Sequence, residues 1–387
     1  MKKLRIAVAL GTRPEVVKLA PVVKVLRSQP ETFEVSVLST GQHRQMLDQA
    51  LAPFGLEVQT DLRLMRENQT LPDLTALALT AVTGALASLR PDMLLVQGDT
   101  TTVLAASLAA FYARVPVGHV EAGLRSHDMA NPFPEEANRR LTSVLAELHF
   151  APTPGAGAEL LREGVAADRV VITGNTVVDA LLELSARPFN PVGTPLEGLP
   201  LEGKRVALVT SHRRESFDGG IERICLALAE LARAFPDLAV VYPLHLNPNV
   251  RRAARSILEG CPGVHLTEPL DYPCIVHLMR RAELILTDSG GIQEEAPTFD
   301  TPVLVLRTVT ERPEASQRGQ AVLVGTDKDL IVATASRLLT DPAARAAMTG
   351  KGNPYGDGRA AGRIARAIQG WAGGQTPPLP PELQFVP

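Results

Sequence analysis

Short runs of Val, Ile and Leu recur along the chain, and each is followed by a polar turn and by a segment whose apolar residues have helical spacing. A strand buried on both faces gives such an uninterrupted apolar run, because helices cover both sides of a parallel sheet. The helical segments between the runs are the crossovers that parallel strands require. The pattern therefore predicts an α/β fold built on parallel sheets.

The alternation occurs twice, and residues 186–204, which are dense in Pro and Gly, separate the two halves. A chain of 387 residues is long enough to bury two cores of ordinary domain size. We therefore expect two domains, each with its own sheet. The expected strands cover residues 6–10, 35–39, 93–97, 116–120, 148–151 and 170–173 in the first half, and 206–210, 240–243, 264–266, 284–287 and 303–306 in the second. The expected helices cover residues 16–27, 74–89, 102–113, 221–234, 275–281, 330–339 and 362–371.

Composition narrows the class of partner. Charged residues make up 21% and the formal net charge is -3, so the chain lacks the positive charge that binds nucleic acid. Aromatic residues make up only 4%, which also argues against a surface that stacks bases. We therefore expect a metabolite as the partner and no nucleic acid.

The cysteines and the apolar runs indicate the cellular compartment in which the protein is expected. Cys225, Cys261 and Cys274 have neither the spacing of a redox pair nor histidines at zinc-ligand intervals, so reduced thiols and a cytoplasmic protein are expected. The first apolar run has no cleavage site and continues into a turn at Gly11, so we interpret it as a buried strand and not as a signal peptide. No run approaches the roughly 20 apolar residues of a membrane-spanning helix, and no membrane association is expected.

The turn after the first expected strand has the sequence GTRPE at residues 11–15. Thr12 and Glu15 have the spacing of a capping box, and the proline falls in the first helical turn, where its missing N–H costs nothing. A well-capped helix would explain the motif by itself. Arg13 and Lys18 add two cations beside a helix N-terminus, an arrangement that favours binding of an anion.

A second turn also follows a buried strand and reads DSGGIQEE at residues 288–295. Ser289, Gly290 and Gly291 would present backbone N–H groups to a diphosphate, since no bulky side chain blocks its approach. Glu295, one turn further along, can accept hydrogen bonds from two ribose hydroxyls. A glycine-rich turn before an acidic helix is the alternative, and a phosphate site is the favoured interpretation.

Polar side chains follow several of the expected strands, at the edge where open α/β sheets bind their ligands. Asp99, Glu121 and His212 come just after buried strands, and Glu135 and Glu136 begin a helical segment. A lone acidic residue at such a place is more often an N-cap or part of a surface ion pair. Several carboxylates and a histidine at one edge make an acid–base site the better hypothesis.

Other polar residues are assigned to packing or left open. His119 and His149 lie within apolar strands and are expected to be packed, hydrogen-bonded core histidines. His245 comes just after a strand and is an intermediate case between a core residue and a site residue. Gly155 and Gly157 lack the third glycine of a dinucleotide-binding fingerprint, so no nicotinamide cofactor is expected.

A series of short motifs, in order along the chain, resembles the motif series of the non-hydrolysing UDP-N-acetylglucosamine 2-epimerases. The motifs are GTRPE (11–15), GDTTT (98–102), HVEAGLR (119–125), PEEANR (134–139), GNT (174–176), SHRRE (211–215), HLNP (245–248), DSGGIQEEAP (288–297) and TERPE (310–314). The resemblance runs from the first strand to NPYGDG at residues 353–358. An ordered series of this length is highly specific.

The resemblance implies a GT-B architecture, in which two Rossmann-like, doubly wound domains have a cleft between them. The expected domains are residues 1–185 and 186–358, and a C-terminal helix at 359–373 is expected to pack back on the first domain. The implied activity is reversible conversion of UDP-N-acetylglucosamine to UDP-N-acetylmannosamine through elimination of UDP to 2-acetamidoglucal, without a metal or other cofactor. A homodimer and a role in cell-envelope polysaccharide synthesis are further family expectations.

The chemistry of that route indicates which residues it needs. Departure of UDP requires cations and N–H groups on the diphosphate, and the C2 proton requires acid–base groups on both faces of the sugar. The residues at the family's catalytic positions are Asp99, Glu121, Glu135 and His212. Those assigned to substrate binding are Arg13, Lys18, Arg139, Ser289, Gly290, Gly291, Glu295 and Arg312. Which carboxylate acts on which face of C2 stays open.

Some bacterial members of the family are activated by substrate at a second, adjacent site. The matching residues here are Gln42, Gln45, Glu136, Arg213 and His245. Asn68 stands where an arginine is expected, so substrate allostery is a hypothesis only.

Three other activities share part of the pattern. A hydrolysing 2-epimerase would release free N-acetylmannosamine and UDP, and a GT-B glycosyltransferase would need an acceptor pocket. A nucleotide-sugar sensor would leave its ligand unchanged. The paired acids Glu121 and Glu135 favour the epimerase over the glycosyltransferase.

Overall fold

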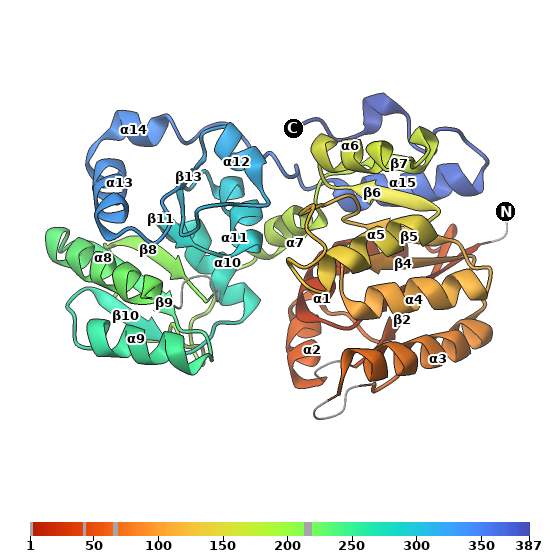
Figure 1. The fold of residues 1–387 in the computed structure, drawn as a ribbon, viewed down its shortest axis with the longest axis horizontal. Helices are drawn as coiled ribbons and strands as arrows, with labels where there is room; N and C mark the ends of the chain where they lie inside the picture. Colours follow the sequence, from red (N-terminus) through yellow and green to blue (C-terminus); the bar gives the residue numbers. More distant parts are fainter. Residues whose placement is uncertain (1–2, 42–43, 65–68, 213–218) are drawn as a thin grey trace. The chain divides into compact units, whose positions relative to one another are not determined.

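The chain forms two compact units, each built on its own sheet. The computed structural model describes residues 3–41, 44–64, 69–212 and 219–387, with the backbone alone for residues 44–47. The first unit contains Met1–Leu182 and Tyr355–Pro387, and the second contains Glu183–Pro354. Both sheets are parallel and have helices against them (Figure 1), which confirms the predicted α/β class.

The sheet of the first unit has seven strands in the order β3-β2-β1-β4-β5-β6-β7. The strands are β1 Leu4–Leu10, β2 Phe33–Ser39, β3 Thr60–Asp61, β4 Met93–Gln97, β5 Val117–Val120, β6 Leu148–Ala151 and β7 Val170–Ile172. The chain order reverses between the neighbours β1 and β4. The carboxyl ends of these two strands therefore flank the switch point at which open α/β sheets bind ligands.

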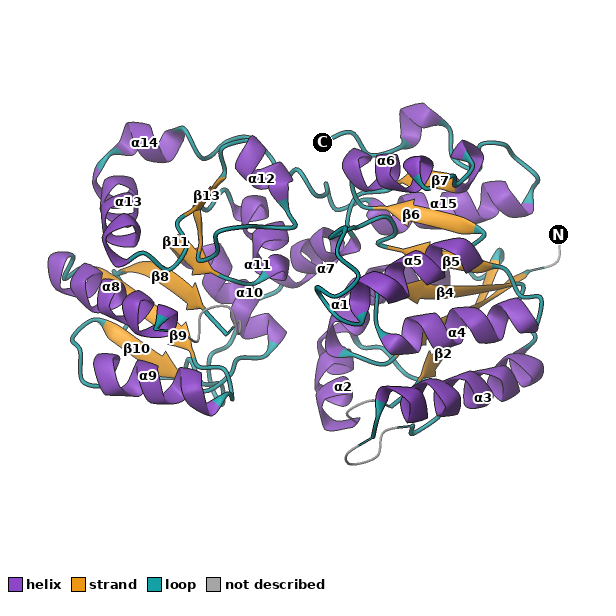
Figure 2. Ribbon diagram, viewed as in Figure 1, coloured by secondary structure: helices purple, strands orange, loops and turns teal. Residues whose placement is uncertain are grey.

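Helices cover this sheet on its faces (Figure 2). They are α1 Arg13–Arg27, α2 Arg44–Leu51, α3 Leu71–Leu89, α4 Thr101–Tyr112, α5 Glu135–Leu145, α6 Pro154–Arg162, α7 Thr176–Ser185, which continues into the second unit, and α15 Ala360–Ala372. Alternate residues of the central strands, such as Ala7 and Ala9 in β1 and Leu94 in β4, form a core with Val82 of α3 and Val103 of α4. The apolar strand runs are thus buried by the crossover helices, as expected.

Helix α3 differs from one expectation. By length and composition alone it qualifies as a candidate membrane span, although no such segment was expected. Leu74, Ala78, Val82 and Leu86 are its buried residues, and this spacing of four is typical of a helix that covers a sheet. Further Ala and Leu residues between these positions raise the hydropathy of the helix without belonging to its buried stripe, so this one helix is weak evidence against the expectation of no membrane association.

The sheet of the second unit has six strands in the order β10-β9-β8-β11-β12-β13. They are β8 Arg205–Thr210, β9 Leu238–Pro243, β10 Val264–Thr267, β11 Ala282–Thr287, β12 Val303–Val305 and β13 Ala321–Leu323. Its helices are α8 Gly220–Ala234, α9 Pro248–Leu258, α10 Tyr272–Arg281, α11 Gly290–Glu295, α12 Pro313–Gln317, α13 Lys328–Thr340 and α14 Pro342–Ala346. The switch point lies between β8 and β11, so both units have the predicted doubly wound, Rossmann-like order.

The C-terminal segment returns to the first unit. Helix α15 packs against α1, and the chain after it buries Leu379 and Phe385. The backbone N–H of Phe385 donates to the carbonyl of Ile172, and the N–H of Ile172 donates to the side chain of Gln384, both at 2.8 Å. The last residues of the chain therefore cover the edge strand β7.

Candidate functional site

Glu15 ties together the two turns at the switch point of the first unit. It is almost fully buried, and its carboxylate accepts hydrogen bonds from the backbone N–H of Gly11 and Thr12 at 2.5 and 2.9 Å. The hydroxyl of Thr100, which caps α4, donates to the other oxygen at 2.7 Å. Burial raises the pKa of Glu15, and these hydrogen bonds offset part of the shift. Arg13 begins α1 directly beside this network.

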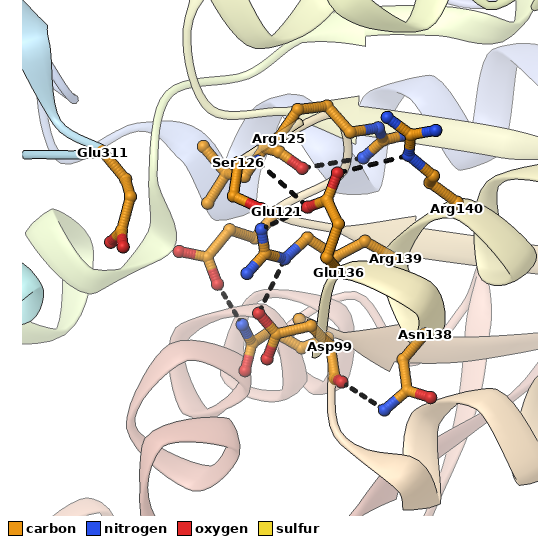
Figure 3. Close-up of polar contacts among 12 residues, drawn as sticks. Asp99, Glu121, Arg125, Ser126, Glu136, Asn138, Arg139, Arg140 and Glu311 are labelled. Atoms are coloured by element: carbon orange, nitrogen blue, oxygen red, sulfur yellow. Dashed lines mark hydrogen bonds and ion pairs between the residues drawn. The ribbon is translucent and has the colours of Figure 1, made fainter. Parts of the chain in front are cut away.

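Asp99 lies in the second of these turns, where α5 holds it from the opposite side (Figure 3). The Nε of Arg139 donates to its carboxylate at 2.9 Å, and the side-chain amide of Asn138 donates to its backbone carbonyl at 2.8 Å. Arg139 also donates to Glu136 at 2.9 Å, and Glu136 is fully buried. Asn138 and Arg139, which both belong to the motif at 134–139, therefore hold the backbone and the carboxylate of Asp99, respectively.

Glu121 is held by three donors from three different elements. Lys18 of α1 and Gln97 at the end of β4 contact its two carboxylate oxygens, and the amide of Asn175 donates to it at 3.2 Å. Its backbone φ of 63° lies in the left-handed region, which a residue with a side chain adopts at a cost of about 1 kcal/mol or more. Such strain persists where the surrounding structure over-determines it, and it points to a functional residue.

Glu135 has a different environment. It is the first residue of α5, four positions before Arg139, so it lies at the same edge of the sheet as Asp99. Its Oε2 atom is buried and has no hydrogen-bond partner among the residues that the structure describes. A buried carboxylate oxygen without a donor is costly in a resting protein, and it is suited to accepting a proton.

His119 supports the turn that carries Asp99. It is fully buried in β5, and its Nε2 lies 2.7 Å from the carbonyl oxygen of Gly98, whose φ is 80°. Burial lowers the pKa of His119 to about 4, so the ring is neutral and donates one hydrogen bond. His149 pairs with it across the neighbouring strand and is also buried. The expectation that both are packed core histidines is confirmed.

In the second unit, the turn after β11 lies between a cation and a carboxylate. A side chain at Gly290 would meet the guanidinium of Arg312 at 3.5 Å, and one at Gly291 would meet the carboxylate of Glu295 at 3.6 Å. Arg312 is held in place by Glu294, to which its Nε donates at 2.7 Å, and the hydroxyl of Tyr272 donates to Glu295 at 3.0 Å. Ser289 is the N-cap of α11. The predicted phosphate and ribose residues are therefore neighbours.

His212 lies across the switch point from this turn. The residue follows β8, and its backbone N–H donates to the carboxylate of the fully buried Asp288, which follows β11, at 2.6 Å. The Nδ1 of its ring lies 3.2 Å from the other carboxylate oxygen of Asp288. On its other side the ring stacks on His245, with 5.3 Å between ring centroids. His212 thus belongs to a compact cluster in the second unit.

The residues assigned to a second substrate site are only partly described. Gln42 and Arg213, like Asn68, lie outside the described residues, and Gln45 is described by its backbone in α2. Both carboxylate oxygens of Glu136 are occupied within the chain, by Arg139, Arg140 and the backbone N–H of Ser126.

Among the described residues, no group of three or more His, Cys, Asp or Glu side chains could hold a metal ion.

A family model described as UDP-N-acetylglucosamine 2-epimerase matches residues 24–369. The chain belongs to this family. It is 50% identical over 371 residues to the UDP-N-acetylglucosamine 2-epimerase of Escherichia coli strain K12, covering 95% of this chain and 98% of that protein. It is 51% identical to the enzyme of the same name from Yersinia pestis, over 95% of this chain and 98% of that one.

Solved structures of 2-epimerases agree with the fold. The Neisseria meningitidis enzyme bound to UDP-GlcNAc has a TM-score of 0.87 at 44% identity, with 95% of this chain and 100% of that chain covered. The Methanocaldococcus jannaschii enzyme in complex with UDP-GlcNAc and UDP has a TM-score of 0.76 at 32% identity, with 95% and 99% covered. A glycosyltransferase of kitacinnamycin shares only the fold, with a TM-score of 0.63 at 17% identity over 98% and 100% of the chains. These likenesses agree with the GT-B class that the motifs implied.

Three side chains that hold the predicted site residues of this 2-epimerase family member were not themselves predicted. Gln97 and Asn175 hold Glu121, and Asp288 holds His212. Gln97 has one signal in the sequence, since it is the polar last residue of the otherwise apolar β4. Asp288 was part of a quoted motif, but the phosphate-binding interpretation used only the residues after it.

Proposed function

We propose that this chain interconverts UDP-N-acetylglucosamine and UDP-N-acetylmannosamine without net hydrolysis. In the proposed route the C2–H bond and the C1–O bond to UDP break, which gives UDP and 2-acetamidoglucal. UDP then adds back to C1 while a proton returns to the opposite face of C2. The atoms balance without an oxidant, a reductant or water.

The contrast between Glu121 and Glu135 is the observation that carries this proposal. Removal and return of a proton on opposite faces of C2 need two groups with different roles. Glu121 accepts hydrogen bonds from three donors and is therefore suited to remaining a carboxylate beside developing positive charge. Glu135 has a buried oxygen to which no described residue donates, which favours a role in proton transfer. Asp99 is the third candidate acid–base carboxylate of the first unit, and it is ion-paired with Arg139.

The second unit supplies groups that match the rest of the substrate. We assign the diphosphate to the backbone N–H groups of Ser289, Gly290 and Gly291 with Arg312, and the ribose hydroxyls to Glu295. Cations stabilise the negative charge that develops on the departing diphosphate, so Arg312 would act in the transition state as well as in binding. Arg13, Lys18 and Arg139 remain further candidates for the diphosphate. His212 is the remaining acid–base candidate.

Proton NMR of UDP-N-acetylglucosamine with the protein in deuterium oxide tests the proposal. The expected result is UDP-N-acetylmannosamine with deuterium at C2, and turnover lower by about 10²-fold or more in Asp99→Asn, Glu121→Gln, Glu135→Gln and His212→Asn. Free N-acetylmannosamine would mean the hydrolysing reaction. Unchanged substrate without deuterium at C2 would leave a sensor or a glycosyltransferase as the function, and an acceptor screen would separate those two.

The remaining family expectations are also proposals. We place the activity in the cytoplasm, supported by the three free thiols, and assign it to precursor supply for cell-envelope polysaccharide. We also propose a homodimer, supported by exposed apolar side chains on α4 and α5. Activation by a second substrate molecule stays a hypothesis, and hyperbolic kinetics with no UDP-N-acetylglucosamine requirement in the reverse direction would contradict it.

A further inference from the structure

The structure assigns a specific task to Asp288: we propose that it is a positioning residue that fixes the His212 ring with the proton on Nδ1, so that Nε2 is offered to the substrate. This inference rests on the proposed function, because it gives His212 a role at the sugar nucleotide. Asp288 itself is fully buried and touches the substrate in no step of the proposal.

The topology brings these two residues together. Strands β8 and β11 are neighbours, and Thr210 pairs with Thr287 at their carboxyl ends. His212 and Asp288 follow these two positions, so they face each other across the switch point of the second unit. The backbone is locked at this point, since the N–H of Asp288 donates to the carbonyl of Thr210 at 3.1 Å. The pair is therefore set by the sheet and not by a surface loop.

Two groups of the turn after β8 donate to one oxygen of the Asp288 carboxylate. The backbone N–H of His212 donates to Oδ2 at 2.6 Å, and the hydroxyl of Ser211 donates to the same atom at 3.3 Å. The buried hydroxyl of Tyr242 in β9 donates to the backbone carbonyl of Ser211 at 3.2 Å, which also holds the turn after β8 in place. Oδ2 thus accepts two hydrogen bonds, and Oδ1 is the oxygen that faces the His212 ring.

The other oxygen of the Asp288 carboxylate makes the contact with the His212 ring. Oδ1 of Asp288 lies 3.2 Å from Nδ1 of His212, and a carboxylate beside a ring nitrogen favours the tautomer that places a hydrogen between them. The contact is an ion-pair distance without the alignment of a linear hydrogen bond, as is common for acid–base pairs before the reacting groups close together. The side chain of His212 is 38% exposed, whereas that of Asp288 is buried, so the charge is behind the ring and the ring faces outward.

His245 limits how the ring can turn. Its ring stacks on that of His212 at an angle of 21°, and its own Nδ1 accepts from the backbone N–H of Asn247 at 3.1 Å. Burial and the neighbouring His212 both lower the pKa of His245, while Asp288 opposes this shift. The lowered pKa favours the neutral form of His245. Asp288 on one side and His245 on the other are the titratable groups that face His212 among the described residues.

The first test reads the tautomer directly in the unmodified protein. Long-range proton–nitrogen NMR of the ¹⁵N-histidine-labelled full chain at pH 8 reports which ring nitrogen carries the proton, and the signal missing from His212→Asn identifies His212. The expected result is a proton on Nδ1. A proton on Nε2 would overturn the inference, and this measurement does not depend on activity or on a variant of Asp288.

The second test asks whether Asp288 acts through His212. Asp288→Asn is expected to lower kcat by about 10²-fold while KM and UDP binding change less than twofold. The limb of the pH–rate profile that reports His212 should move to lower pH, because loss of the negative charge lowers the pKa of a neighbouring imidazole. A slower enzyme with an unmoved limb would mean only a structural role.

The third test uses the double variant. If Asp288 works only by orienting His212, Asp288→Asn/His212→Asn should be no slower than His212→Asn alone. Multiplied losses would contradict the inference. Asp271→Asn, at the N-cap of α10 in the same unit, is the matched control and should keep its turnover. Normal turnover of His212→Asn would overturn this inference alone, whereas absence of UDP-N-acetylmannosamine with the unmodified protein would count against the proposed function, so the two failures are distinguishable.

Discussion

The hydroxyl of Thr100 donates a 2.7 Å hydrogen bond to the carboxylate of Glu15, which joins the turn after β4 to the turn after β1. These turns carry Asp99 and Arg13, so one buried carboxylate holds two parts of the candidate site. In the second unit Asp288 joins the turns after β8 and β11 in the same manner. Both units thus use a buried acidic side chain to bridge the switch point.

Glu15→Gln should weaken both the fold and the reaction. Glutamine is neutral and has one acceptor oxygen in place of two, so it cannot replace all the hydrogen bonds that Gly11, Thr12 and Thr100 donate to a charged group, which are worth about 1.5–3 kcal/mol each. Urea unfolding should show that loss, and kcat should fall roughly tenfold as Asp99 shifts. Glu31→Gln, at an exposed position, serves as the control. Unchanged stability of Glu15→Gln would mean that the turns do not depend on this carboxylate.

Lys18→Met should leave Glu121 as a buried charge without its cation. The side chains of the pair are only 13% and 6% exposed, and removal of one partner from a buried pair costs about 3–5 kcal/mol. We expect a lower free energy of unfolding by urea and a loss of turnover larger than that of Lys24→Met on the same helix. Equal effects of the two variants would show that Lys18 contributes only as a general surface cation.

Stability should fall in acid because of the buried histidines. Burial lowers the pKa of His149 from 6.5 to about 3, so the unfolded chain takes up a proton below pH 6.5 that the folded chain does not. The stabilising effect is therefore complete above pH 6.5 and decreases as the pH falls. Between pH 7 and 5 His149 should account for about 2 kcal/mol of the decrease in the free energy of unfolding. His149→Phe should remove that part in urea titrations at the two pH values, and the full decrease in that variant would refute the assignment.

The apolar surface on α4 and α5 should hold a second copy of the chain. Val144 is 83% exposed and Tyr112 is 64% exposed, and such side chains on neighbouring helices form the patch expected of a dimer contact. Light scattering should give a dimer for the unmodified chain and a monomer for Val144→Glu. Val386→Glu, which changes a valine that is 81% exposed in the tail, should remain a dimer. A dimer of Val144→Glu would place the contact elsewhere.

Glu295→Ala should weaken nucleotide binding without abolishing the fold. Loss of hydrogen bonds from ribose hydroxyls to a carboxylate costs about 1.5–3 kcal/mol, so the Kd for UDP measured by calorimetry should rise about 10–100-fold. Tyr272→Phe removes only the hydroxyl that donates to Glu295 and should change the Kd much less. Comparable losses in both variants would argue that Tyr272, and not the carboxylate, makes the important contact.

The large elements of the fold were predictable because their physical signal is strong. Buried parallel strands such as β4 are continuous apolar runs, whereas the two units divide between Leu182 and Glu183, within α7 and before the Pro- and Gly-rich stretch. Strands β3 and β13 were not predicted, because they have only two and three residues and lie at sheet edges, where little apolar sequence is needed. Strand-end position was enough to nominate Asp99, Glu121 and His212.

Partners within the site were harder to predict. Asn175 reaches Glu121 across a sequence separation of 54 residues, and nothing local in the chain reveals such a contact. Glu135 and Glu136 are adjacent in the sequence. Among the described residues, however, one oxygen of Glu135 is buried without a hydrogen-bond partner, whereas Glu136 accepts from two arginines and a backbone N–H. Helix geometry sends neighbouring side chains in different directions, and only the packed structure decides which faces the site.

The return of the C-terminal segment to the first unit has a consequence for synthesis in the cell. The ribosome delivers Met1–Leu182, then the whole second unit, and only afterwards Tyr355–Pro387 with α15, Leu379 and Phe385. Until then the surface of α1 that packs on α15 and the edge of β7 stay uncovered. The unit that begins first can therefore be completed only last, the reverse of the usual N-terminal order of domain folding.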